Sequence, residues 1–161
     1  MNQKLKIALL QINSFKTDQR GNLIKGEEYC RMAKDLNADI VLFPEMWNIG
    51  YESFNESAIE TGFDPRNIPE SIKNEVNLWT SNALEIDSEF VEHYRKLAGE
   101  LDIAIAITFL QKGKDKPFNS VILIDKHGNI VLNYSKVHTC DFSMEYFCEP
   151  GENFYVFELD T

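Results

Sequence analysis

Two charged residues, Glu45 and Lys136, each come directly after an apolar stretch that has the character of a β-strand. Ligands of open α/β sheets bind beyond the carboxyl ends of the strands, so we expect these two side chains to share one site. A glutamate at such a position, beside large apolar neighbours, would lose hydration and exchange protons near neutrality. A lysine there can donate to a developing oxyanion or pair with a buried glutamate. The two residues therefore indicate general-base chemistry with stabilisation of negative charge.

Each residue also has an ordinary structural explanation. Glu45 would serve equally well as an acidic loop residue or as the cap of a following helix. A lysine that follows a strand, such as Lys136, is most often a solvated surface residue. Position alone leaves both alternatives open.

The rest of the chain has the pattern of a single α/β domain in which strands and helices alternate. The opening run, residues 4–12, is mostly apolar and is expected to be a central strand buried on both faces. The spacing of apolar and charged residues then favours a β-α-β unit. The remaining predicted elements are helices over 22–36 and from Asp87 or Ser88 to Leu101, strands over 39–43 and 103–110, and a hairpin of 120–124 with 130–134.

Two long segments without periodicity separate these elements. Residues 44–86 mix aromatic, polar and acidic side chains, and Pro65 and Pro69 interrupt any long helix there. A stretch of this length in a compact domain predicts a functional loop. The second segment, 135–153, precedes a last apolar stretch over 154–159.

The composition excludes several classes of function. With 43% hydrophobic and 26% charged side chains, 161 residues suffice for one domain with a sizeable core. The formal net charge of −10 repels phosphate backbones and anionic headgroups, so we expect no nucleic acid and no membrane as partner. No apolar run approaches the roughly 20 residues of a membrane span and no secretory signal opens the sequence, which favours a cytoplasmic location.

No cofactor and no metal is expected. The glycines form neither a GxGxxG motif nor a phosphate-binding loop. Histidines and acidic residues are not clustered at the spacing of metal ligands. The three cysteines contain no CxxC pair, so neither a disulfide framework nor a zinc knuckle is indicated, and reduced thiols agree with a cytoplasmic location.

Two short motifs give the chain a family resemblance. The run 39–46 (DIVLFPEM), an apolar strand leading into Phe-Pro-Glu, resembles the first signature of the nitrilase superfamily of carbon-nitrogen hydrolases. The run 134–138 (YSKVH) resembles the second. The resemblance extends over nearly the whole chain, because further matches lie at Leu10-Gln11, Asn119-Ser120, 125–129 and Pro150-Gly151.

This resemblance implies a four-layer αββα sandwich, of which residues 1–161 would form the N-terminal portion. It also implies hydrolysis of a small-molecule amide, carbamoyl compound or nitrile by a Cys-Glu-Lys triad through a cysteine-bound intermediate, without a cofactor. Glu45 would be the general base and Lys136 would stabilise the tetrahedral intermediate. The family often has a second glutamate that positions the substrate and holds the lysine. Glu145 matches it best, and Glu149 is the weaker candidate.

The nucleophile of the family has no match in this sequence. In the family it follows a further strand, in a context such as Gly-x-x-Ile-Cys, and the sequence ends at Thr161 before any such segment. Cys30 has the pattern of a packing residue. Cys140 and Cys148 are conceivable substitutes, although neither follows a sharp strand-end turn. His138 either orients a charged partner or bonds the backbone of its own loop.

Two other functions stay open at this point. The unmatched nucleophile would also fit a non-catalytic fragment or remnant that acts by association with other chains. A small acidic nucleotide-binding domain ranks last, because no phosphate loop is present. A chain that ends after Leu159 would supply only part of a second sheet and leave strands such as 103–110 with apolar faces and open edges. We therefore expect a catalytically silent chain that forms a homo-oligomer.

Overall fold

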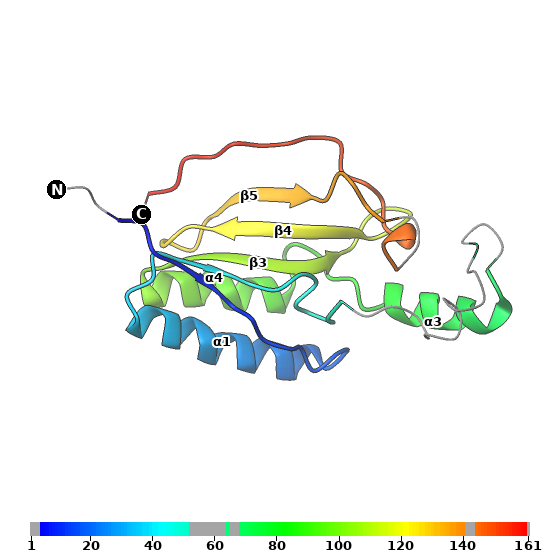
Figure 1. Ribbon diagram of the computed structural model, residues 1–161, viewed down its shortest axis with the longest axis horizontal. Helices are drawn as coiled ribbons and strands as arrows, with labels where there is room; N and C mark the ends of the chain where they lie inside the picture. Colours follow the sequence, from blue (N-terminus) through cyan, green and yellow to red (C-terminus); the bar gives the residue numbers. More distant parts are fainter. Residues whose placement is uncertain (1–3, 52–63, 65–67, 141–143, 161) are drawn as a thin grey trace.

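A mixed five-stranded sheet is the centre of the fold (Figure 1). The computed structural model describes residues 4–51, 64, 68–140 and 144–160. The strands lie in the order of the sequence, the first three parallel and the last two antiparallel. They are β1 (Ile7–Leu9), β2 (Ile40–Leu42), β3 (Ala104–Gln111), β4 (Phe118–Ile124) and β5 (Ile130–Ser135). The ends of β2, β3 and β5 and the start of β4 therefore meet at one edge of the sheet.

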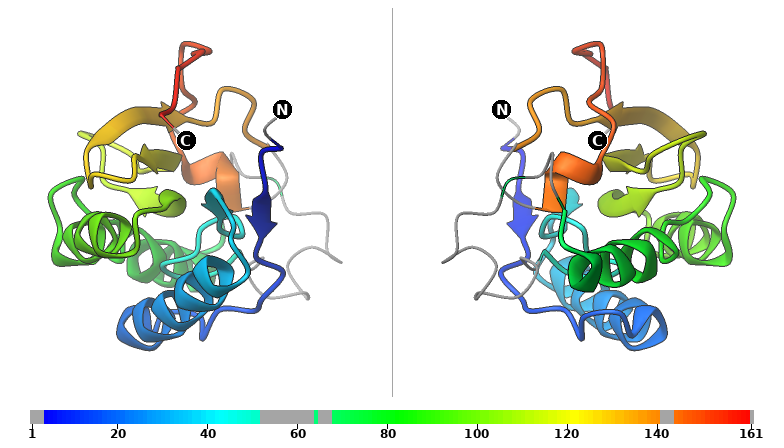
Figure 2. Two further views of the ribbon diagram at one scale, coloured as in Figure 1. Left: turned by 90° about the vertical axis from the view of Figure 1, so that its left-hand side faces the viewer. Right: turned by 90° about the vertical axis from the view of Figure 1, so that its right-hand side faces the viewer.

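Two helices, α1 (Gln19–Asp35) and α4 (Glu89–Leu101), lie side by side against one face of this sheet (Figures 1 and 2). The main core fills the space between them and the strands; its large members include Phe43, Trp47, Phe90, Tyr94, Ile105, Ile107, Phe109 and Ile122. A third helix, α3 (Glu70–Thr80), lies beyond the end of the sheet toward which β3 and β5 point (Figure 1). No described helix is both long and apolar enough to cross a membrane.

The helix starts follow from side-chain caps. Asp18 accepts a hydrogen bond of 2.9 Å from the backbone N–H of Gly21, so α1 begins three residues before the expected position. Ser88 caps α4 by accepting from the N–H of Val91, which confirms the predicted start of that helix. The predicted strands over 39–43 and 103–110 and the predicted hairpin are confirmed as well.

The close approach of α1 to the aromatic core depends on Gly26. A Cβ at this position would overlap the hydroxyl of Tyr94 and come within 2.8 Å of both Phe43 and Trp47. We therefore predict that Gly26→Ala lowers the free energy of unfolding by about 1–3 kcal/mol, the usual cost of overpacking a core. The control is Gly99→Ala in α4, where the added Cβ would meet its nearest neighbour at 3.6 Å.

That control should raise stability by about 0.5–1 kcal/mol, because alanine is the better helix former and no contact is strained. Urea unfolding of both variants, followed by circular dichroism, measures the two effects. Equal effects from the two substitutions would show that α1 can move away from the aromatic cluster.

The expectation that the first strand is central and buried on both faces is wrong. Among the described residues, β1 has three residues and pairs only with β2, at the edge of the sheet. Ala8 packs toward the helices, whereas Ile7 and Leu9 point to the opposite face and are 48% and 63% exposed. An apolar run alone does not tell whether a second layer covers it.

The expectation that β3 exposes an apolar face and an open edge is also wrong. β3 lies between β2 and β4, and almost all of its residues are buried. Exposed apolar side chains are found instead on the helix-free face of the sheet near β1 and along the C-terminal stretch; they include Ile7, Leu9, Leu42, Phe154, Tyr155, Val156 and Phe157. That stretch, shown in red in Figure 1, runs past β5 without forming a helix or strand.

The described part of the segment expected to be a long loop contains the regular helix α3. Pro69 is the N-cap of α3, so proline marks a helix start here rather than an interruption. The expectation for Pro65 lies outside the described residues. The second irregular segment contains a short 3-10 helix, η1 (Met144–Phe147), which matters for the site.

Candidate active site

A tight turn after β2 fixes the position of Glu45. Met46 has a φ of 52°, in the left-handed region that a bulky side chain seldom adopts. The N–H of Trp47 donates to the carbonyl oxygen of Thr108 at 3.1 Å, and the hydroxyl of Thr108 donates to the carbonyl oxygen of Pro44. The turn is thus fastened to β3 on both sides of Glu45. Backbone strain held in this way is often found at functional sites.

A buried asparagine, Asn48, ties the same turn to the rest of the core. Its Oδ1 accepts from the N–H of Leu110 at 2.9 Å, and its Nδ2 donates to the carbonyl oxygen of Asn82 at 3.3 Å. The carbonyl oxygen of Asn48 in turn accepts from Nδ2 of Asn22 in α1 at 2.8 Å. Three separate elements therefore hold the turn that carries Glu45.

Lys136 follows the end of β5 and is held through its backbone. Its N–H donates to the carbonyl oxygen of Asn119 at 2.8 Å, and its carbonyl oxygen accepts from the N–H of Gly151 at 2.9 Å. Its side-chain Nζ lies 2.9 Å from Oε1 of Glu45 and 2.7 Å from Oε1 of Glu145. The expected proximity of Glu45 and Lys136 is confirmed.

Glu145, in η1, is the buried acid of the site. Its side chain is fully buried, and it accepts hydrogen bonds from Nζ of Lys136, from Nδ2 of Asn119 at 2.5 Å and from the backbone N–H of Cys140 at 2.8 Å. Asn119 also donates to Oε1 of Glu45 at 2.6 Å. We refer to Glu45, Asn119, Lys136 and Glu145 as the charged cluster.

The charged cluster shifts the pKa values of its members in opposite directions. Burial acts to raise the pKa of Glu145, but the hydrogen bonds from Lys136, from the backbone of Cys140 and from Asn119 outweigh it and lower this pKa to about 2. Burial acts to lower the pKa of Lys136, yet its bonds to Glu145 and Glu45 outweigh that cost and hold the pKa above its ordinary value. Both groups are therefore charged at neutral pH.

The lowered pKa of Glu145 predicts that the stability of the protein depends on pH. The pKa of Glu145 falls from 4.5 to about 2 on folding, so the unfolded chain binds more protons than the folded chain between these values. The stabilisation is fully present above pH 4.5 and is lost as the pH falls toward 2. We predict that Glu145→Gln flattens the fall in melting temperature across this window, measured by calorimetry. A variant that melts in parallel with the wild type over the whole window would contradict a charged, stabilising Glu145.

The expectation that Glu45 itself loses hydration is wrong. Its two large neighbours, Met46 and Trp47, turn into the two core clusters and are fully buried, which leaves the Glu45 side chain 42% exposed. Glu149, the weaker alternative for the second glutamate, is exposed and takes no part in the charged cluster. The desolvated carboxylate is Glu145.

The cysteines differ sharply in their surroundings. Cys30 and Cys148 are buried, and burial raises the pKa of each thiol to about 12. The expectation that Cys30 is a packing residue is confirmed. Cys140 is partly exposed beside the charged cluster, where its hydrogen bond to Glu145 and then partial burial raise its pKa. A raised pKa makes all three thiols poor nucleophiles.

His138 contacts the C-terminal stretch. Its exposed ring lies 5.9 Å from the ring of Phe154, a contact with the C-terminal stretch. Within the described residues, no three histidine, cysteine or acidic side chains are grouped as a metal ion would require.

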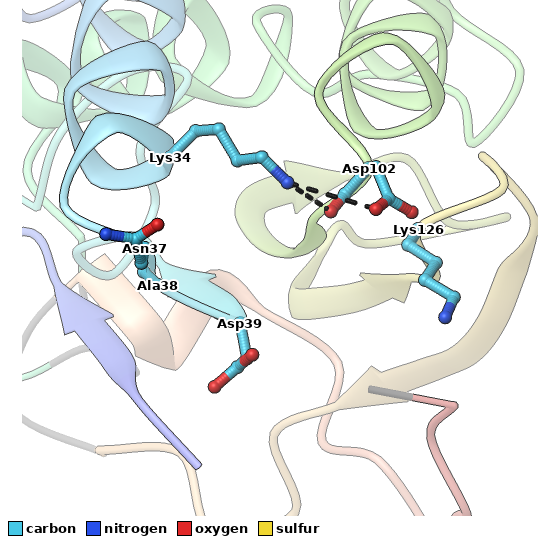
Figure 3. Close-up of a pocket in the computed structure, with 6 residues that line it drawn as sticks. All are labelled: Lys34, Asn37, Ala38, Asp39, Asp102 and Lys126. Carbon is cyan, nitrogen blue, oxygen red and sulfur yellow. Dashed lines mark hydrogen bonds and ion pairs between the residues drawn. The ribbon is translucent and has the colours of Figure 1, made fainter. Parts of the chain in front are cut away.

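A pocket of about 460 Å³ adjoins Glu45. Its wall is both polar and aromatic, formed by Ile12, Asn13, Ser14, Lys16, Pro44, Trp47, Gly50 and Tyr51 together with Glu45. A second pocket, of about 250 Å³, lies where β2 and β3 begin, at the opposite edge of the sheet (Figure 3). There Lys34 points to Asp102 and donates to its carbonyl oxygen at 2.9 Å, so its charge is already engaged. Of these two pockets, the first meets the charged cluster, at Glu45.

Asn119 was not singled out as a site residue from the sequence. The predicted site residues follow strands, whereas Asn119 lies near the start of β4, an antiparallel strand. Because β4 runs opposite to its neighbours, its start lies at the same edge as their ends. A polar residue at the beginning of an antiparallel strand is the signal that would have found it.

Comparison with known proteins identifies the family. The carbon-nitrogen hydrolase family matches residues 6–161. The chain is 25% identical over 161 residues to a glutamine-dependent NAD(+) synthetase of Thermotoga maritima, covering 98% of this chain and 24% of that protein. It is 26% identical over 151 residues to a citrullinase of Francisella tularensis, covering 91% of this chain and 46% of that protein.

A solved amidase from Nesterenkonia sp. has the same fold. The TM-score is 0.66 at 21% identity, over 95% of this chain and 50% of that one. The chain thus spans half or less of the length of each of these three proteins. With an α/β fold of the nitrilase type and a match over nearly its whole length, this chain belongs to the carbon-nitrogen hydrolase family.

Proposed function

We propose that the charged cluster is the acid-base half of a site that hydrolyses amide or carbamoyl C–N bonds, and nitriles as a second class. One observation carries the proposal: a single lysine is shared by two carboxylates, at 2.9 and 2.7 Å, at the edge of the sheet where the parallel strands end. An isolated surface ion pair needs only one acid. Here one lysine is bound by a buried glutamate and, at the same time, by a second, exposed one.

The proposed reaction divides the work between the three charged groups. Glu45 removes the proton of a cysteine thiol, which the charged cluster itself does not contain, and the thiolate attacks the carbonyl carbon. Lys136 donates to the oxygen on which negative charge develops. The C–N bond then breaks, and the proton held by Glu45 passes to the leaving nitrogen, which departs as ammonia or an amine. Glu45 next takes a proton from water, whose oxygen attacks the thioester; the carbon–sulfur bond breaks, the proton passes from Glu45 to the departing sulfur, and the carboxylic acid is released.

Exposure of Glu45 supports its part in this scheme. A base has to reach both a thiol and a water molecule, and the 42% exposed carboxylate of Glu45 remains accessible where the fully buried Glu145 does not. Glu145 instead binds the lysine. The two acids thus have separate roles because their surroundings differ.

The pocket beside Glu45 supports a small substrate. Its volume of about 460 Å³ is within the range of small-molecule sites. Two relatives are named after glutamine and citrulline, which carry an amide and a carbamoyl group respectively, each beside a carboxylate.

The test is a substrate panel with the full-length protein. Amides, carbamoyl compounds and nitriles, each with and without a carboxylate, are incubated with the protein, ammonia is measured, and the protein mass is recorded. We expect ammonia from carboxylate-bearing amides or carbamoyl compounds and a covalent adduct on a cysteine. Failure of every compound to give either signal would refute the proposal.

A second candidate function is association with other chains, favoured by the run of exposed apolar residues at 154–157. Val156 is fully exposed, and open apolar segments of this kind recruit partners. Light scattering of the 161-residue chain at micromolar concentration should show a homodimer or larger assembly. A monodisperse monomer would exclude this second function and the expected homo-oligomer.

A further inference from the structure

We propose that Asn119 is a positioning residue that sets the separation of the two carboxylates around Lys136. This inference rests on the proposed function, because it assigns a further member to the same site. The amide of Asn119 lies opposite the lysine, and both groups bond to the same two oxygen atoms, Oε1 of Glu45 and Oε1 of Glu145.

The geometry at Asn119 uses the full donor capacity of its amide. A side-chain amide nitrogen carries two N–H bonds, and here Nδ2 lies 2.6 Å from Glu45 and 2.5 Å from Glu145. Ionised carboxylates only accept, so the nitrogen and not the oxygen of the amide must face them. The group acts as a rigid fork between two acids that come from distant parts of the chain.

The backbone of Asn119 strengthens the case. Its carbonyl oxygen accepts from the N–H of Lys136 at 2.8 Å, and the residue pairs with Leu110 within the sheet. Asn119 is 5% exposed. The same residue therefore fixes the lysine through its main chain and the two glutamates through its side chain.

Charge explains why a second donor is needed. Two carboxylates and one ammonium leave an excess of negative charge, and two carboxylate oxygens this close repel each other. Lysine is a flexible chain with a rotating head group, so it does not define an angle between two acids. A planar amide carried by a strand of the sheet does define the angle between the two acids. Without it, Glu45 would be free to swing away from the lysine.

Two substitutions test whether Asn119 acts by positioning the two glutamates or only by packing. Asn119→Ala removes both donated bonds, whereas Asn119→Asp keeps the shape and replaces the donor with a third acceptor. The matched control is Ser120→Ala: Ser120 is the next residue of β4, is also buried, and has a side-chain hydrogen bond to Ser135 at 3.1 Å outside the charged cluster.

In the full-length protein, Asn119→Ala should lower kcat by about 10²-fold, the effect of misplacing reacting groups by about 1 Å, with KM changed less than about threefold. Asn119→Asp should lower kcat further at neutral pH. It should regain part of the rate as the pH falls, because a protonated carboxylic acid again donates a hydrogen bond. Ser120→Ala should keep the wild-type rate and pH profile.

A second readout does not need activity. In the protein with ¹³C-labelled glutamate side chains, the carboxyl carbon of Glu145 should titrate near pH 2 in the wild type and about one pH unit higher in Asn119→Ala, the effect of one lost hydrogen bond. Asn119→Asp should move it in the same direction, and Ser120→Ala should not move it. Asn119→Asp has the same shape as the wild-type residue, so it keeps the test valid where Asn119→Ala does not fold.

The two readouts distinguish the two proposals. A wild-type protein without hydrolase activity, combined with a Glu145 titration that shifts in both Asn119 variants, would refute the proposed reaction and retain Asn119 as the group that positions the acids. An unshifted Glu145 in the folded variants, or wild-type kcat in both, would overturn the role of Asn119 whatever the reaction is.

Discussion

Glu45→Gln in the full-length protein is expected to lower kcat by at least about 10²-fold, the lower range for loss of a general base. Glutamine keeps the volume of glutamate and still accepts a hydrogen bond from Lys136, but it cannot take a proton from a thiol or from water. Ammonia release at saturating substrate measures the loss. Because Glu45 is partly exposed, the melting temperature should change little.

The matched control is Glu85→Gln. Glu85 forms an ion pair of 2.8 Å with Lys112, and both side chains are more than half exposed. It therefore resembles the pair of Glu45 and Lys136 in charge and distance but lies outside the charged cluster. A Glu45 variant that retains the activity of the Glu85 variant would remove Glu45 from the role of base.

The second large effect is expected for Lys136→Met, which keeps the length of the side chain and removes its charge. Loss of the donor to the developing oxyanion should lower kcat by about 10²–10³-fold. The same change leaves the buried Glu145 with one partner fewer, at a cost of about 1–3 kcal/mol in the free energy of unfolding. Activity and urea unfolding of one preparation measure both.

The direction of the pKa change in Lys136→Met also follows. Burial pushes the pKa of Glu145 upward, and Lys136 is the strongest of the groups that push it down. Without the lysine, that carboxyl should titrate closer to neutrality. Lys112→Met serves as the control because this lysine is exposed, and its loss should alter neither rate nor unfolding. A Lys136 variant with the same profile as the control would disprove a shared lysine at the site.

The sequence was sufficient to predict much of the fold and the meeting of Glu45 with Lys136. Apolar runs identified β2, β3 and the hairpin, and the spacing of apolar residues identified α1 and α4. Since β2 and β5 point to the same edge of the sheet, residues that follow them had to come together. Local pattern and strand direction were enough for that inference.

What the sequence did not reveal depends on contacts between distant segments. The run that forms β1 is as apolar as a central strand, yet it lies at an edge, because the order of strands is not encoded in any one of them. Glu145 and Glu149 differ by only four positions. Glu145, within η1, is fully buried and Glu149 is exposed, a difference that only the path of the chain around Lys136 decides.

The distances along the chain between members of the charged cluster have a consequence for the order of folding. Glu45 is separated by 74 residues from Asn119 and by 91 from Lys136, whereas the serines that join β4 to β5 are 15 residues apart. Hairpins close within microseconds, while contacts between remote segments wait for slower events. During folding, the backbone amides of the hairpin should therefore become protected from hydrogen exchange before the Glu45 turn docks on β3. A chain emerging from the ribosome would carry an ordered hairpin before it held any assembled charged cluster.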